Sequence, residues 1–127
     1  MAIYAFGAYY DTDVSQNFID NNVVGTGWDE KDAPELFQYI KSLKVGDIVY
    51  IKSFSPASPD IFIKAIGIIS DSEFVQNEKG VKCGRNVVWK YKKTIRIAKP
   101  VEKNNVRANT MYEEFHPEIQ SLILSKL

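Results

Sequence analysis

Few side chains in this 127-residue sequence have the types and spacing that catalysis requires. A nucleophilic mechanism needs an activated serine, threonine or cysteine beside a base, and the sequence contains one cysteine, Cys83, and one histidine, His116. These two residues belong to no local motif, so we interpret them as an incidental thiol and an exposed histidine before a helix. A zinc site takes three or four Cys, His or carboxylate ligands. The sequence therefore predicts no metal and no other cofactor.

Two further patterns match catalytic or cofactor motifs only in part. Glu113 and Glu114 lie close to His116, but neighbouring residues on a helix diverge by about 100° and share no geometry suited to acid–base work. The Gly-x-Gly pattern at 25–27 is followed by tryptophan and acidic residues instead of a phosphate-binding turn, which excludes a P-loop and a dinucleotide fingerprint. We expect a binding protein and no enzymatic activity.

Aromatic residues make up 13% of the chain, and several occur where a buried core does not obviously need them. Trp28 stands between a glycine and two acidic residues, and Phe54 stands between two serines in a proline-containing loop. Trp89 and Tyr91 lie on a predicted strand. Core packing explains each aromatic residue on its own, but together they predict an aromatic-lined cleft. Trp28 is the stronger candidate, because Trp89 would share a face with apolar strand residues.

The zero net charge conceals an uneven distribution of charged side chains. Residues 1–81 carry twelve acidic and six basic side chains, whereas residues 82–107 carry one acidic and nine basic ones. A basic segment of this kind attracts phosphate backbones whatever the global charge. The alternative, a solvated strand and loop, is equally compatible with the sequence.

The elements that must position these residues can be placed from periodicity and capping patterns. We expect strands in the apolar run 1–10 and over 23–28, 48–52, 60–69 and 86–97, a loop over 53–59, and helices after Asp13, from Asp32 to Leu43 and after Pro117. Asp32 is expected to cap the second helix, with Pro34 in its first turn. In the last strand, alternation places Val87, Trp89, Tyr91, Ile95 and Ile97 on one face and the basic residues on the other.

This order of elements predicts a single α+β domain over residues 1–127, built on a curved mixed sheet or small β-barrel with flanking helices. The lone Cys83 permits no internal disulfide and favours a reducing, cytoplasmic location. The N-terminal run lacks the features of a signal peptide and is too short to cross a membrane, so no membrane association is expected.

Several short motifs carry a resemblance to a known family. They are Gly25-Thr26-Gly27-Trp28-Asp29-Glu30, then Lys44-Val45-Gly46-Asp47-Ile48-Val49-Tyr50, then Ala65-Ile66-Gly67-Ile68-Ile69 and Val87-Val88-Trp89. In this order they resemble the EVE-like branch of the PUA-like domains, and especially the amino-terminal reader domains of bacterial modification-dependent restriction systems. The resemblance spans roughly residues 3–97. It implies a curved barrel with flanking helices and a cleft that receives a nucleobase, often a modified one flipped between aromatic side chains.

The resemblance also implies roles for individual residues. Trp28 would be a wall or lid of the cleft, Asp29 would hydrogen-bond a base edge, Ser53 and Phe54 would line the cleft, and Trp89 with Tyr91 would form its back. The basic residues Lys90, Lys92, Lys93 and Arg96 would hold the nucleic-acid backbone. Stacking a base on an aromatic side chain contributes about 1–3 kcal/mol, which offsets the few kcal/mol that flipping costs.

Three functions remain open at this point. The first is a reader of a modified or flipped base in DNA or RNA, which would act through an effector protein partner because no nuclease or motor domain follows. The second is a sensor of small, nucleoside-like molecules that uses the same cleft. The third is a protein-interaction module without a pocket, in which Trp28 and Phe54 form the contact patch.

Overall fold

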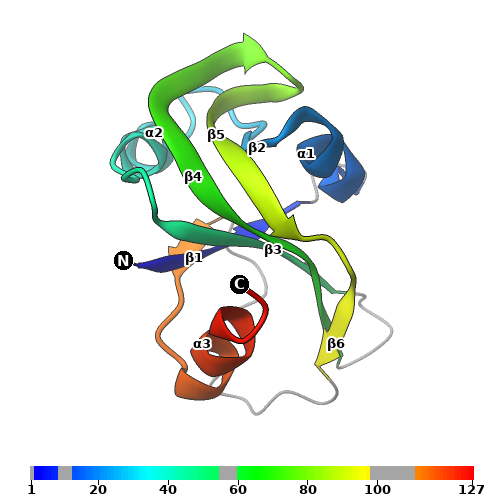
Figure 1. The fold of residues 1–127 in the computed structure, drawn as a ribbon. Helices are drawn as coiled ribbons and strands as arrows, with labels where there is room; N and C mark the ends of the chain where they lie inside the picture. Colours follow the sequence, from blue (N-terminus) through cyan, green and yellow to red (C-terminus); the bar gives the residue numbers. More distant parts are fainter. Residues whose placement is uncertain (1, 9–12, 55–59, 98–110) are drawn as a thin grey trace.

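The computed structural model describes residues 2–8, 13–54, 60–97 and 111–127, which form an α+β fold with a seven-stranded mixed sheet and three helices (Figure 1). The strands are β1 (Ile3–Gly7), β2 (Val23–Thr26), β3 (Ile48–Phe54), β4 (Ile61–Glu78), β5 (Val81–Tyr91), β6 (Ile95–Ile97) and β7 (Met111–Glu113). The helices are α1 (Ser15–Asn21), α2 (Pro34–Lys41) and α3 (Pro117–Leu124). The expected α+β class with a mixed sheet and flanking helices is confirmed.

The strands follow the order β2-β5-β4-β3-β1-β7, and β6 pairs with the beginning of β4. Strands β1 and β3 are parallel, and the other pairs are antiparallel. Within the described residues the sheet is open, with β2 at one end of the order and β7 at the other. Of the two expected forms, the described chain therefore adopts the open sheet and not the closed barrel.

Both faces of the sheet are buried, because successive residues of a strand point to opposite sides. On β3, Val49 and Ile51 join one hydrophobic cluster, and Ile48 and Tyr50 join a second. The first cluster includes residues of α1 and α2, and the second includes residues of α3. Figure 1 shows α1 and α2 beside the β4–β5 hairpin, with α3 at the other end of the molecule. The sheet thus separates an α1/α2 side from an α3 side.

The helices form where prolines and capping patterns predict them. Pro34 and Pro117 each occupy the first turn of a helix, where the missing N–H has no intrahelical partner to lose. His116 Nδ1 accepts a hydrogen bond from the backbone N–H of Glu118 at 3.2 Å and so caps α3. The expected cap by Asp32 is wrong, since Ala33 holds the cap position of α2 without a side-chain bond.

The boundaries of the later strands differ most from the prediction. Strand β4 continues beyond 60–69 to Glu78 and returns through a tight turn into β5. The two central residues of that turn, Lys79 and Gly80, have φ angles of 55° and 79°, as in the mirror-image turns that match the twist of a hairpin. The expected strand over 86–97 is therefore two strands, β5 and β6, and β7 was not predicted.

A bulge separates two aromatic residues that simple alternation places on one face. Gly67 pairs with Trp89, and Ile66 pairs with Tyr91, so Lys90 is an extra residue on β5. Trp89 belongs to the cluster on the α1/α2 side, and Tyr91 packs against the cluster on the α3 side. The expectation that the two rings share a face is wrong for this reason.

None of the helices in the described part of the chain has the length and apolar character needed to span a membrane. The tyrosines at 9 and 10 in the expected first strand, and the prolines of the expected 53–59 loop, lie outside the described residues.

Candidate functional site

Trp28, the strongest aromatic candidate, lies in the segment between β2 and α2 with 53% of its surface exposed. Its backbone N–H donates to Thr26 Oγ1 at 3.1 Å, which holds the turn. The neighbouring Asp29 forms an exposed ion pair with Lys82 at 3.6 Å. An exposed ion pair of this kind contributes little to stability. The indole is thus available to a partner, but no second aromatic residue of the predicted cleft joins it within the described chain.

Trp89 is a core residue with 7% of its surface exposed. Its indole Nε1–H donates to the backbone carbonyl of Phe18 on α1 at 3.0 Å. The ring lies against Gly67 on β4, where an added Cβ would come within 2.8 Å of Trp89 Cε3. The glycine of the Ala-Ile-Gly-Ile-Ile motif therefore makes room for the tryptophan of the Val-Val-Trp motif.

The other residues predicted for the cleft are dispersed. Tyr91 is half-buried near α3, with the ammonium of Lys126 5.4 Å from the centre of its ring. Ser53 is half-buried near the end of β3, opposite Phe62. Phe54 pairs with Ile61 through its backbone, and its side chain lies outside the described structure. The described side chains therefore do not assemble the expected aromatic cage.

The predicted basic flank is partly preserved. Lys90, Lys92 and Lys93 are exposed at and just after the end of β5. Arg96 instead contacts the buried carboxylate of Asp60, with its Nη2 at 2.5 Å and its Nε at 2.6 Å. Three basic residues of the segment, at positions 99, 103 and 107, lie outside the described residues.

An open hollow of about 470 Å³ lies beside β5, from the last residue that pairs with β2 onward, and we call it the β5 hollow. The end of α1 contributes Asn21 and Asn22, and β5 contributes residues 86–89. Ser70, Lys79 and Lys92 complete its border. Among these residues, the sequence predicted a binding role only for Trp89 and Lys92. The asparagines went unnoticed because their pattern is typical of the end of a helix.

Some polar side chains at this hollow already have hydrogen-bond partners, and others do not. Asn86 is held from both sides, since its Nδ2 donates to the Asp71 carboxylate at 3.2 and 3.3 Å and its Oδ1 accepts from Lys79 Nζ at 2.9 Å. By contrast, the side chains of Asn22, Ser70 and Lys92 make no hydrogen bond or ion pair with any residue that the structure describes. The hollow therefore offers an amide, a hydroxyl and an ammonium to a ligand.

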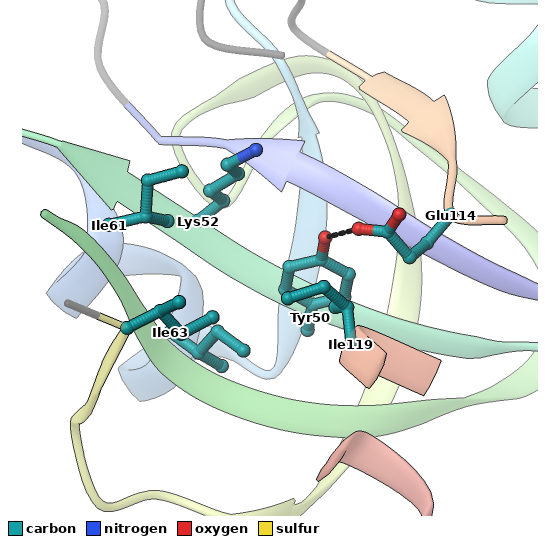
Figure 2. A pocket seen from close by; sticks show the side chains of 7 residues that line it. Tyr50, Lys52, Ile61, Ile63, Glu114 and Ile119 are labelled. Carbon is teal, nitrogen blue, oxygen red and sulfur yellow. Dashed lines mark hydrogen bonds between the residues drawn. The ribbon is translucent and has the colours of Figure 1, made fainter. Parts of the chain in front are cut away.

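A second cluster of polar groups lies on the α3 side of the sheet, and Figure 2 shows its members Tyr50, Lys52 and Glu114. Tyr50 Oη donates to Glu114 Oε1 at 2.5 Å, and Lys52 Nζ donates to the Tyr112 hydroxyl at 2.5 Å. The two tyrosine hydroxyls lie 3.4 Å apart, which links the four side chains. Burial raises the pKa of Tyr112 to about 12, and burial together with the nearby Tyr112 and Glu114 raises the pKa of Tyr50 further.

The void beside this cluster is small. It measures about 10 Å³ and has apolar walls, mostly of isoleucine side chains from β4, β6 and α3. A void of this size holds one water molecule at most, and such a water needs polar partners. We therefore regard the Lys52–Tyr112–Tyr50–Glu114 chain as a structural network and not as a ligand pocket.

Arg85 is a further residue whose role the sequence did not reveal. Its charge belongs to the basic segment, yet only 1% of its surface is exposed. Its guanidinium donates to the carbonyls of Ile40, Lys41 and Leu43 at the end of α2 and to those of Asp71 and Glu73 on β4. Burial lowers its pKa from the ordinary value. This arginine joins a helix to the bent part of β4.

The nucleophile and base considered from the sequence lie on opposite sides of the sheet. Cys83 is buried on the α1/α2 side, and burial raises the pKa of its thiol, which makes it less reactive. His116 caps α3 on the other side. Across the described ranges, no three His, Cys, Asp or Glu side chains come close enough to hold a metal ion.

Comparison with known proteins does not assign the chain to a family: no protein-family model matches the sequence, and a search of curated proteins finds no match.

Proposed function

We propose that this protein is a non-catalytic module that binds a nucleobase of DNA or RNA in the β5 hollow. The observation that supports this most is the size and lining of the hollow. Its volume of about 470 Å³ falls within the range of about 300–1,000 Å³ that is usual for small-ligand sites. Polar groups and two lysines border it, as a base with an attached phosphate requires.

Each class of lining group has a counterpart on a nucleotide. The amide of Asn22 can donate and accept at once, as the edge of a base demands. Lys79 and Lys92 lie on the border, where an ammonium can bind a phosphate oxygen. Val88 is 46% exposed and offers an apolar surface to a sugar or base face. The exposed Lys90 and Lys93 extend the positive charge beyond the hollow.

We further propose that the fold is PUA-like and EVE-like. The open mixed sheet with helices on both sides and the close packing of Gly67 on Trp89 support this proposal. In this proposal the base is recognised mainly by polar groups of the β5 hollow, and Trp89 contributes one edge of its ring. A module of this kind would act through an effector protein.

The test is binding of fluorescein-labelled single-stranded DNA and RNA oligonucleotides, measured by fluorescence anisotropy at several salt concentrations. We expect the logarithm of the affinity to fall linearly with the logarithm of the salt concentration. Replacing Lys79 and Lys92 together by methionine should weaken binding and reduce the slope by about 0.7 for each phosphate that the variant no longer neutralises. The control for loss of a positive charge is Lys44→Met, an exposed lysine that does not line the hollow.

Two results would contradict the proposal. Wild-type protein that binds no oligonucleotide at low salt would exclude nucleic acid as the ligand. Binding that the Lys79 and Lys92 variants leave unchanged would place the interface elsewhere. Thermal stabilisation by free nucleosides without any salt dependence would instead favour the sensor of small molecules.

A further inference from the structure

The side chain of Lys79 is held at both of its ends, although it lies on the surface. Its backbone is in the tight turn between β4 and β5, and its carbonyl accepts a hydrogen bond from Asn17 Nδ2 at 2.9 Å. Its ammonium donates to Asn86 Oδ1 at 2.9 Å. A free lysine side chain loses conformational entropy when it is ordered.

Asn86 can accept from Lys79 because its own orientation is determined. Its Nδ2 faces the Asp71 carboxylate at 3.2 and 3.3 Å, so its Oδ1 points the other way. Asp71 is itself held, since its backbone carbonyl accepts from Arg85 Nη2 at 3.0 Å and its Oδ1 accepts from the N–H of Glu73 at 2.9 Å. A series of hydrogen bonds therefore connects the buried Arg85, through Asp71 and Asn86, to the ammonium of Lys79.

We propose that Asp71 and Asn86 are positioning residues that hold the Lys79 ammonium at the border of the β5 hollow to bind a phosphate group of the ligand. This inference rests on the proposed function and adds to it the residues that hold the phosphate-binding lysine in place before the ligand arrives. Asn86 leaves Lys79 with further N–H donors, because an ammonium has three and one is used.

A lysine that is ordered before binding contributes more to the affinity for the ligand than a mobile lysine does. Immobilising a long side chain on binding weakens association by about two- to tenfold for each such side chain. Asn86→Ala removes the acceptor and frees the ammonium while leaving the charge of the protein unchanged. We therefore expect Asn86→Ala to weaken binding of a single-stranded oligonucleotide by about two- to tenfold.

The experiment is a double-mutant cycle with Asn86→Ala, Lys79→Met and the combined variant, measured by fluorescence anisotropy with one labelled oligonucleotide. If Asn86 acts through Lys79, Asn86→Ala has no further effect once Lys79 is methionine. Thermal unfolding followed by circular dichroism verifies that each variant is folded. Lys44→Met again serves as the control for loss of one positive charge.

The possible results separate the two proposals. Coupled losses in the cycle, with wild-type binding to the oligonucleotide stronger than to the free nucleoside, support the positioning role. Additive losses, or no loss from Asn86→Ala, overturn that role and leave the nucleic-acid function standing. Failure of the wild-type protein to bind any oligonucleotide overturns the proposed function and this inference with it.

Discussion

Replacing Arg85 by methionine is expected to destabilise the protein by about 3–5 kcal/mol, the usual result of breaking a buried charged network. The guanidinium makes five hydrogen bonds to backbone carbonyls, of which those to Ile40 and Leu43 are fully buried. Each bond from a charged donor contributes about 1.5–3 kcal/mol. The two buried bonds alone thus contribute about 3–6 kcal/mol to the free energy of unfolding. The substitution also removes the cost of burying the charge, so the net loss of stability is smaller.

Methionine keeps about the length and volume of the apolar stem and removes the guanidinium, whose Cζ lies 5.4 Å from the centre of the Phe74 ring. The change in stability therefore reports the hydrogen bonds more than the packing. Arg85→Lys keeps the charge but places all the donors on one atom. We therefore expect it to lower the free energy of unfolding by about half as much as Arg85→Met does. Urea unfolding followed by tryptophan fluorescence gives both values, provided the slope with denaturant is unchanged.

The reasoning would be refuted if Arg85→Met cost less than about 1 kcal/mol, because unsatisfied buried carbonyls alone exceed that value. Lys44→Met is the matched control, since this exposed lysine follows the same helix and should change stability by less than about 0.5 kcal/mol.

Three further predictions concern the two sides of the sheet. Trp89→Phe should cost about 1–3 kcal/mol, because it removes the buried hydrogen bond from the indole to the Phe18 carbonyl and leaves a void beside the smaller ring; stability equal to wild type in urea unfolding would contradict a core role. Gly67→Ala should destabilise the fold by more than about 1 kcal/mol, because the added Cβ would clash with the Val87 side chain, the Val88 carbonyl and the Trp89 ring; a neutral thermal-unfolding result would disprove this close packing. The pKa of Tyr112 is raised to about 12 from an ordinary value of 10.0, which favours the protonated form in the folded state. The contribution of Tyr112 to stability is therefore complete below pH 10 and is lost as the pH rises from 10 to about 12. Tyr112→Phe should reduce this alkaline loss of stability, and identical pH profiles for the variant and wild type would contradict the assignment.

The parts of the fold that the sequence predicted are those with strong periodicity. The apolar periodicity between Asp32 and Leu43, together with Pro34 and Pro117, located two helices within a few residues. The outer half of the β4–β5 hairpin was missed, because residues 70–80 are largely exposed and polar, a composition typical of a loop. A two-stranded ribbon in solvent needs no apolar alternation, and only the Lys79–Gly80 turn indicates it.

The site was harder to predict, because a single bulge changes which side chains meet. Nothing in the sequence identifies Lys90 as the extra residue of β5, and strict alternation across it placed Trp89 and Tyr91 together. Arg85 illustrates a related difficulty: its charge suggests a surface patch, although its donors satisfy buried carbonyls. Such roles depend on contacts between residues more than forty positions apart.

The most direct test of the proposed function is an NMR titration of ¹⁵N-labelled protein with an unlabelled single-stranded oligonucleotide. If the β5 hollow is the binding site, the largest chemical-shift changes will fall on the backbone amides of Asn22, Ser70, Val88 and Lys92. Changes confined to Trp28 and its neighbours, or to the α3 side of the sheet, would contradict the proposal, as would a spectrum that does not change at all.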